Sequence, residues 1–199
     1  MNYSLLRATA VAAIALFAPA GAIADSGHGH GNVSATSGGH MSEGGHRHGG
    51  AVGKPGKASE ASRTVEVVMH DNSYEPKSIT VKAGETIRFK VRNAGQLVHE
   101  FNIGTPQMHK AHGPEMMEMM QQGVLMPDRI DEQAAKAMHG SMGHGMHDDP
   151  NSVLLEPGDA GEVVWTFPKD AEVNLQFACN VPGHREAGMV GDLRMKHGH

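Results

Sequence analysis

Residues 177–189 read Phe177-Ala178-Cys179-Asn180-Val181-Pro182-Gly183-His184-Arg185-Glu186-Ala187-Gly188-Met189 and include the only cysteine of the 199-residue chain. The spacing is C-x4-H-x4-M. A thiolate, an imidazole and a thioether on one short loop are ligands for a soft or borderline metal ion. One further histidine from elsewhere would complete two histidines, a cysteine and a weak axial methionine, the ligand set of a type 1 copper site.

The residues before Cys179 alternate as in a β-strand with one buried face. Val173, Leu175, Phe177 and Cys179 share one parity, so the cysteine is expected to point into the core. Pro182-Gly183 predicts a turn just before His184. Met189 is expected to begin the next strand, which would let one loop surround one ion. The alternative is that Cys179 is a small buried hydrophobe without a ligand role.

A second histidine with the same orientation occurs upstream. Leu97, His99, Phe101 and Ile103 share one face of a predicted strand, so His99 is also expected to point inward. An inward histidine is more often a satisfied core residue than a ligand, and His70, at the end of the first predicted strand, is a rival. His99 is therefore a candidate for the fourth ligand, and His70 remains an alternative at this point.

In these motifs the chain resembles the cupredoxins, the type 1 (blue) copper proteins. The resemblance covers about residues 64–104 and 151–196, and its motifs are Gly84-Glu85-Thr86-Ile87-Arg88-Phe89, His99-Glu100-Phe101 and Cys179 through Met189. It implies an all-β fold, a Greek-key β-sandwich, with one copper ion bound by His99, Cys179, His184 and Met189. Many cupredoxins have asparagine directly after the first histidine ligand. This chain has Glu100, which bears on hydrogen bonding at the thiolate.

The N-terminal residues predict export. Arg7 precedes an apolar run that is short for a membrane span, and Ala22-Ile23-Ala24 predicts cleavage after Ala24. Residues 1–24 are therefore interpreted as a signal peptide, with the mature protein in the periplasm and no membrane span after cleavage. Residues 25–63 are rich in glycine, serine and histidine and are expected to be disordered. Their His-x-His pairs are candidates for weak copper binding.

Residues 64–199 are expected to form the cupredoxin domain, interrupted by a partly helical insertion at about 105–150. One predicted helix lies between Pro114 and Gly123, and a second runs from an N-cap at Asp128 to about Met138. The insertion contains nine methionines and five histidines. Methionine is a flexible core filler, but thioethers also select Cu(I), and the sequence favours additional, weakly bound copper here.

Composition and motifs limit the function. The net charge of −5 gives no indication of a nucleic-acid partner. The resemblance, with the histidine- and methionine-rich segments, favours a copper-tolerance protein that binds, buffers or oxidises copper. The alternative is a soluble electron carrier for a respiratory or oxidase partner protein. A copper enzyme is not expected, because one cysteine and one domain provide a single type 1 site.

Overall fold

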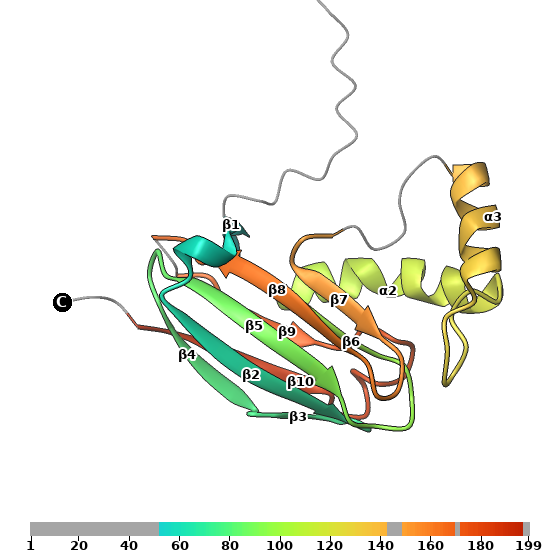
Figure 1. Ribbon diagram of the computed structural model, residues 1–199, viewed down its shortest axis with the longest axis horizontal. Coiled ribbons are helices and arrows are strands. Elements are labelled where there is room, and N and C mark those ends of the chain that lie inside the picture. The colour runs from blue at the N-terminus through green and yellow to red at the C-terminus, as the bar shows by residue number, and fades with distance from the viewer. Residues whose placement is uncertain (1–51, 143–148, 170–171, 197–199) are drawn as a thin grey trace, which may run out of the picture. The chain divides into compact units, whose positions relative to one another are not determined.

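The computed structural model describes residues 52–142, 149–169 and 172–196, with side chains only up to residue 138 in the first range. The predicted signal peptide, most of the segment 25–63 and the Met146 region lie outside these ranges. Two five-stranded sheets form a sandwich (Figure 1). This confirms the predicted all-β class. None of the described helices is long and apolar enough to cross a membrane.

The first sheet has the strand order β1-β8-β5-β2-β3. Its strands are β1 (Lys54–Pro55), β8 (Ala160–Thr166), β5 (Thr86–Asn93), β2 (Arg63–His70) and β3 (Ser73–Glu75). The second sheet has the order β4-β10-β9-β6-β7. Its strands are β4 (Ser78–Lys82), β10 (Val190–Lys196), β9 (Leu175–Ala178), β6 (His99–Gly104) and β7 (Ser152–Leu155). β2 pairs with β5 and β4 with β10 in parallel, and the other pairs are antiparallel.

Alternating side chains form the core between the sheets. In β5, Ile87, Phe89 and Val91 are buried while the intervening basic residues face outward, as the period of two predicts. Phe101 of β6 lies at the centre of an aromatic cluster. Its ring centroid is 5.4 Å from that of Phe89 and 5.3 Å from that of Phe177. β6 and β9, which lead to the predicted ligands, are therefore anchored by their aromatic residues.

Part of the segment that the sequence predicts to be disordered forms regular structure. β1 and a short 3-10 helix, η1 (Ala58–Glu60), fall within the segment 25–63 that is expected to be disordered. The Trp165 indole N–H donates to the Val52 carbonyl at 2.9 Å, and the Gly56 N–H donates to the Val164 carbonyl at 2.9 Å. These long-range bonds order a polar stretch that has no hydrophobic pattern of its own.

The insertion contains two helices, but their predicted bounds are wrong. α2 (Pro106–Gln121) begins eight residues before Pro114 and continues through it. Thr105 is its N-cap and accepts a hydrogen bond from the Met108 N–H, with Pro106 in the first turn. Burial of Met116 and Met119 stabilises the helix against the cost of an internal proline.

The second insertion helix, α3 (Glu132–Met142), also begins later than predicted. Asp131, rather than Asp128, accepts hydrogen bonds from the Gln133 and Ala134 N–H groups, both at 2.9 Å. A side chain that accepts from the second and third backbone amides after it is in the N-cap position. Both aspartates are chemically suited to this role, and tertiary structure selects the later one.

β6 is buried along its whole length. His99, Phe101 and Ile103 face the sandwich core, while Glu100 and Asn102 point to the opposite face. Helix α2 contacts β6 and β9, and His112 of α2 contacts Glu100. The insertion helix therefore covers a sheet face that would otherwise be exposed, directly behind the strand that carries His99.

Candidate metal centre

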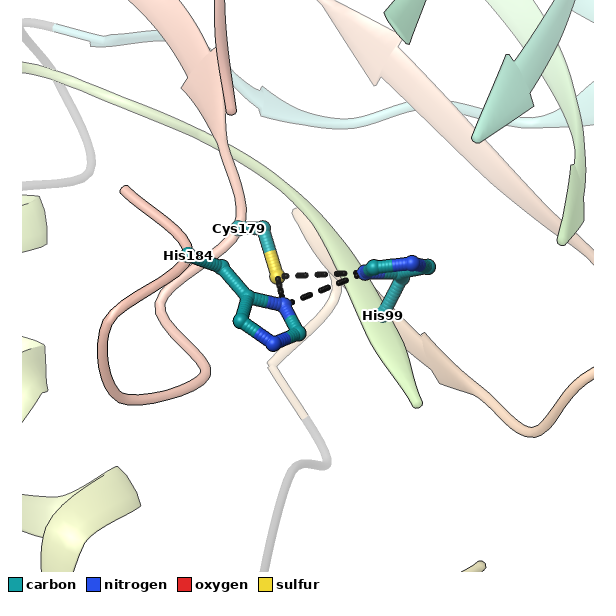
Figure 2. Close-up of side chains that lie close together, drawn as sticks. All are labelled: His99, Cys179 and His184. Carbon is teal, nitrogen blue, oxygen red and sulfur yellow. Dashed lines mark hydrogen bonds between the residues drawn. The ribbon is translucent and has the colours of Figure 1, made fainter. Parts of the chain in front are cut away.

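Three predicted ligands lie close together (Figure 2). The Cys179 Sγ atom is 3.4 Å from the His184 Nδ1 atom and 4.0 Å from the His99 Nδ1 atom. The two Nδ1 atoms are 3.1 Å apart. His99 is at the start of β6, Cys179 follows β9, and His184 lies on the loop between β9 and β10. All three ligand atoms therefore face a common point.

Asp71 fixes the orientation of the His99 ring through the ring nitrogen that faces away from Cys179. Its Nε2 atom is 2.9 Å from Asp71 Oδ1, and Asp71 also accepts hydrogen bonds from the Gln96 and Leu97 N–H groups. This contact directs the Nδ1 atom of His99 toward Cys179. Gly95 lies so close that a Cβ atom at this position would collide with Asp71 Oδ1 and His99 Nε2. A glycine is required here by close approach.

Cys179 is fully buried at the end of β9. Its Sγ atom accepts a hydrogen bond of 3.3 Å from the Glu100 backbone N–H. In the metal-free chain, burial raises the pKa of the Cys179 thiol to about 12, against the lowering effect of this hydrogen bond. A cation that replaces the thiol proton would therefore relieve an unfavourable buried thiolate charge.

The ligand loop is closed by backbone hydrogen bonds. The Met189 N–H donates to the His184 carbonyl at 3.0 Å, and the Cys179 N–H donates to the Met189 carbonyl at 3.2 Å. Met189 is therefore held beside Cys179, with its side chain fully buried. Gly183 and Gly188 both have positive φ, 88° and 102°. No atom lies within 4 Å of a Cβ at Gly188, so its positive φ, rather than close approach to the site, explains this glycine.

The chemistry of these residues fits copper. Burial lowers the pKa of His99, and burial together with the neighbouring His99 lowers the pKa of His184, so both imidazoles are neutral at neutral pH, the form that binds a metal. Two imidazoles and a thiolate, with a buried thioether nearby in sequence, fit a type 1 copper site. The rival His70 is exposed and contacts Glu75 at 3.6 Å instead. The structure thus brings His99, and not His70, to Cys179.

Glu100 occupies the position where the resemblance implies asparagine, and its side chain is fully buried on the α2 side of β6. Its Oε1 atom accepts from Ser152 Oγ at 2.6 Å and Asn102 Nδ2 at 3.0 Å. Its Oε2 atom accepts from the Asn180 N–H at 3.1 Å and Asn180 Nδ2 at 2.8 Å. The carboxylate therefore fixes Asn180, which adjoins Cys179. The His112 Nε2 atom lies 3.3 Å from Oε1.

The insertion also lies beside the ligand loop. A cavity of about 540 Å³ separates α2 from residues 180–186 of the loop, with His109 and Met117 on one side and Pro182 and Arg185 on the other. Burial lowers the pKa of His109 to about 4, so this imidazole is neutral. The loop that carries His184 is therefore bordered by the insertion helix along one side.

Five of the insertion methionines are clearly either buried or exposed. Met116, Met119 and Met138 are buried in the hydrophobic core cluster, which is the packing role of methionine. Met117 and Met120 are 43% and 38% exposed on α2. Helical spacing would place Met120 on the same face as Met116 and Met119, but Met120 is exposed while the other two are buried. Met146 and its neighbouring histidines lie outside the described residues.

Sequence reasoning missed the residues behind the ligands. No sequence pattern marks Asp71 as the partner of His99, because an aspartate after a strand is a common turn residue. Glu100 and Asn102 have the opposite parity to His99, which predicts an outer face. A helical insertion directly after this strand was the one indication that the outer face is covered. His112 has no signal in the sequence beyond its place in a histidine-rich segment.

Comparisons with known proteins show which family the chain is similar to. Residues 50–131 match the family of the cupredoxin-like domain. The copper-resistant cuproprotein CopI of Pseudomonas aeruginosa is 50% identical over 159 residues, which cover 75% of this chain and 84% of the relative. CopI of Rubrivivax gelatinosus is 41% identical over 196 residues, with 97% and 98% covered. The solved structure of auracyanin B has a TM-score of 0.50 at 19% identity, with 74% of this chain and 96% of that chain covered, which shows a shared fold.

Proposed function

Because this chain belongs to the family of the copper-resistant cuproproteins CopI, within the cupredoxins, we propose that it binds one type 1 copper ion for copper tolerance in the periplasm. The proposed ligands are His99, Cys179 and His184, with Met189 as the weak axial ligand. The convergence of the two Nδ1 atoms and the Sγ atom within 4.8 Å of one another carries the proposal. When bound in such a set, copper exchanges one electron between Cu(I) and Cu(II).

Each residue of the proposed site has a separate role in binding the ion. Cys179 supplies the thiolate and accepts the Glu100 amide hydrogen bond, which stabilises its negative charge. Asp71 orients His99. The backbone bonds that join His184, Met189 and Cys179 hold the loop in a shape that can remain the same in both oxidation states. Small rearrangement favours fast electron exchange, and burial of Cys179 excludes water from the thiolate.

A role in tolerance is also supported by the chain's histidine and methionine content outside the centre. Met117 and Met120 are exposed on α2 and suit Cu(I). We infer that they and the histidine-rich segments bind additional copper weakly. Titration of the protein with copper measures the number of such ions. That the chain is a copper-binding protein rather than an enzyme stays a prediction.

The second candidate is an electron carrier for a redox partner protein. His184 favours it, because this residue is half-buried while His99 and Cys179 are fully buried. A ligand at the surface is the natural exit for an electron. A carrier, however, has no need of methionine- and histidine-rich segments.

Disruption of the gene separates the two functions. Tolerance predicts copper-sensitive growth that wild-type protein restores and the Cys179→Ser variant does not. A carrier predicts a respiratory defect at low copper with unchanged copper sensitivity. The His70→Gln variant is the matched control, because it removes an exposed histidine away from the centre, and it should restore growth as wild type does. Copper tolerance unaffected by gene loss would contradict the proposal.

A further inference from the structure

The insertion helix contacts Glu100, the residue after the predicted ligand His99, through the largely buried side chain of His112. His112 of α2 lies with its Nε2 atom 3.3 Å from Glu100 Oε1, and the two side chains are 11% and 0% exposed. The His112 Nδ1 atom is 3.0 Å from Glu115 Oε2, which fixes the ring. The imidazole therefore bridges two carboxylates, one of them behind the thiolate.

Glu100 transmits this contact to Cys179 by two routes. Its backbone N–H donates to the Cys179 Sγ atom at 3.3 Å. Its Oε2 atom holds both the backbone N–H and the side-chain amide of Asn180, the residue after Cys179. A displacement of the Glu100 carboxylate would therefore move the amide donor and the start of the ligand loop together.

Electrostatics explains why a cation is needed at this position. A buried carboxylate is stable only when it is paired and hydrogen-bonded. Burial by itself lowers the pKa of His112, but its contacts with Glu100 and Glu115 raise it to about 9, so His112 is positively charged at neutral pH. Its charge lies within the low-dielectric layer between α2 and β6, where interactions between charges are strong.

We propose that His112 is a positioning residue through which the insertion helix sets the oxidation preference of the copper centre. Its imidazolium holds the Glu100 carboxylate behind Cys179 and offsets the negative charge of that carboxylate. Without this cation, the negative charge near the thiolate favours Cu(II), and the midpoint potential falls. The inference rests on the proposed copper site and deepens it, since it gives the insertion a role at the site itself.

The first test is a double-mutant cycle in the copper-free protein. Unfolding in urea is measured for His112→Gln, Glu100→Gln and the double variant. We expect His112→Gln to lower the folding equilibrium constant by about tenfold or more, since the buried Glu100 carboxylate loses one of its partners, a cation. The double variant should lose much less than the two single changes predict together. His112→Lys, which keeps the charge, should recover part of the loss.

The second test is the midpoint potential and visible spectrum of the same variants loaded with copper. His112→Gln should have a lower potential than wild type, and the double variant should return toward it. His70→Gln is the matched control, because His70 faces Glu75 at 3.6 Å on the exposed surface. Its potential should equal that of wild type.

The proposal requires both coupling in the double-mutant cycle and a lowered midpoint potential in His112→Gln. Additive losses in the cycle would show that His112 and Glu100 do not act as a pair, and an unchanged potential in His112→Gln would show a purely structural contact. Either outcome overturns it. Wild-type protein without a thiolate-to-copper absorption band would instead refute the proposed function, while the copper-free cycle would still decide whether the ion pair exists.

Discussion

The Nδ1 atom of His99 lies 3.1 Å from the Nδ1 atom of His184, although 85 positions separate the two residues in sequence. Their ring centroids are 4.9 Å apart and their planes are inclined by 55°. Two nitrogens at this distance share one proton or face one cation. Since Cys179 Sγ is 3.4 Å from His184 Nδ1, the chain has the donor atoms in place, and binding of an ion requires little reorganisation.

The contact between Asp71 and His99 predicts a loss of affinity. Asp71→Ala removes the acceptor that orients the imidazole, and loss of such a partner typically weakens metal binding by about 10- to 100-fold. Competition with a copper chelator measures the change. Asp192→Ala is the control, since this residue forms an exposed pair with Arg194 at 3.7 Å. Equal affinities of the two variants would contradict the orienting role.

Gly95 and Gly113 provide a matched pair of glycine substitutions. Gly95→Ala places a methyl group against Asp71 and His99, and such overpacking costs about 1–3 kcal/mol of unfolding free energy. Gly113→Ala has no atom within 4 Å and lies in α2. It should gain up to about 1 kcal/mol from helix propensity. Urea unfolding of the copper-free variants gives both values, and a harmless Gly95→Ala would refute the close approach.

Cys179 should react slowly with thiol reagents in the metal-free protein, because its thiol is buried. With its pKa raised to about 12 from 9.0, the thiolate fraction of Cys179 falls by about a thousandfold, and thiol reagents react with the thiolate. A disulfide reagent at neutral pH should therefore modify the folded chain at least about a thousandfold more slowly than the chain in urea. Equal rates would show an accessible, ionised cysteine.

His112 gives the copper-free protein a defined pH dependence. Its pKa in the folded chain is raised to about 9 from 6.5. A raised pKa contributes stability that is fully present below about 6.5 and is lost as the pH rises through 9. The pKa values of His99, His109 and His184 are lowered, so these residues change the stability only below about pH 6.5. Urea midpoints from pH 6 to 10 should fall for wild type more than for His112→Gln, and parallel curves would refute the assignment.

The sequence predicts what local patterns determine. Period-two alternation placed His99 and Cys179 on inward faces, because strand geometry alone fixes which face a residue occupies. The C-x4-H-x4-M spacing likewise placed His184 on a turn after Cys179. The structure brings these three residues together, as predicted, and the ligand roles of all four residues, Met189 included, stay predictions.

Long-range contacts account for what the sequence did not predict. Helix α2 continues through Pro114 because Met116 and Met119 pack on the sandwich, whereas its start at the N-cap Thr105 is a local signal. Glu100 has the pattern of a solvent-facing residue, and only the position of α2 in space buries it. Asp71 approaches His99 across 28 positions, a distance that no periodicity encodes.

The most direct measurement is the copper-to-protein ratio, together with the visible spectrum, of mature protein and of its Cys179→Ser variant. A type 1 site predicts intense thiolate-to-copper absorption in the native protein. In the variant, this absorption and one copper ion should both be lost. Further copper retained by Cys179→Ser would be the weakly bound ions of the histidine- and methionine-rich segments. A copper-loaded native protein without thiolate-to-copper absorption would contradict the central assignment.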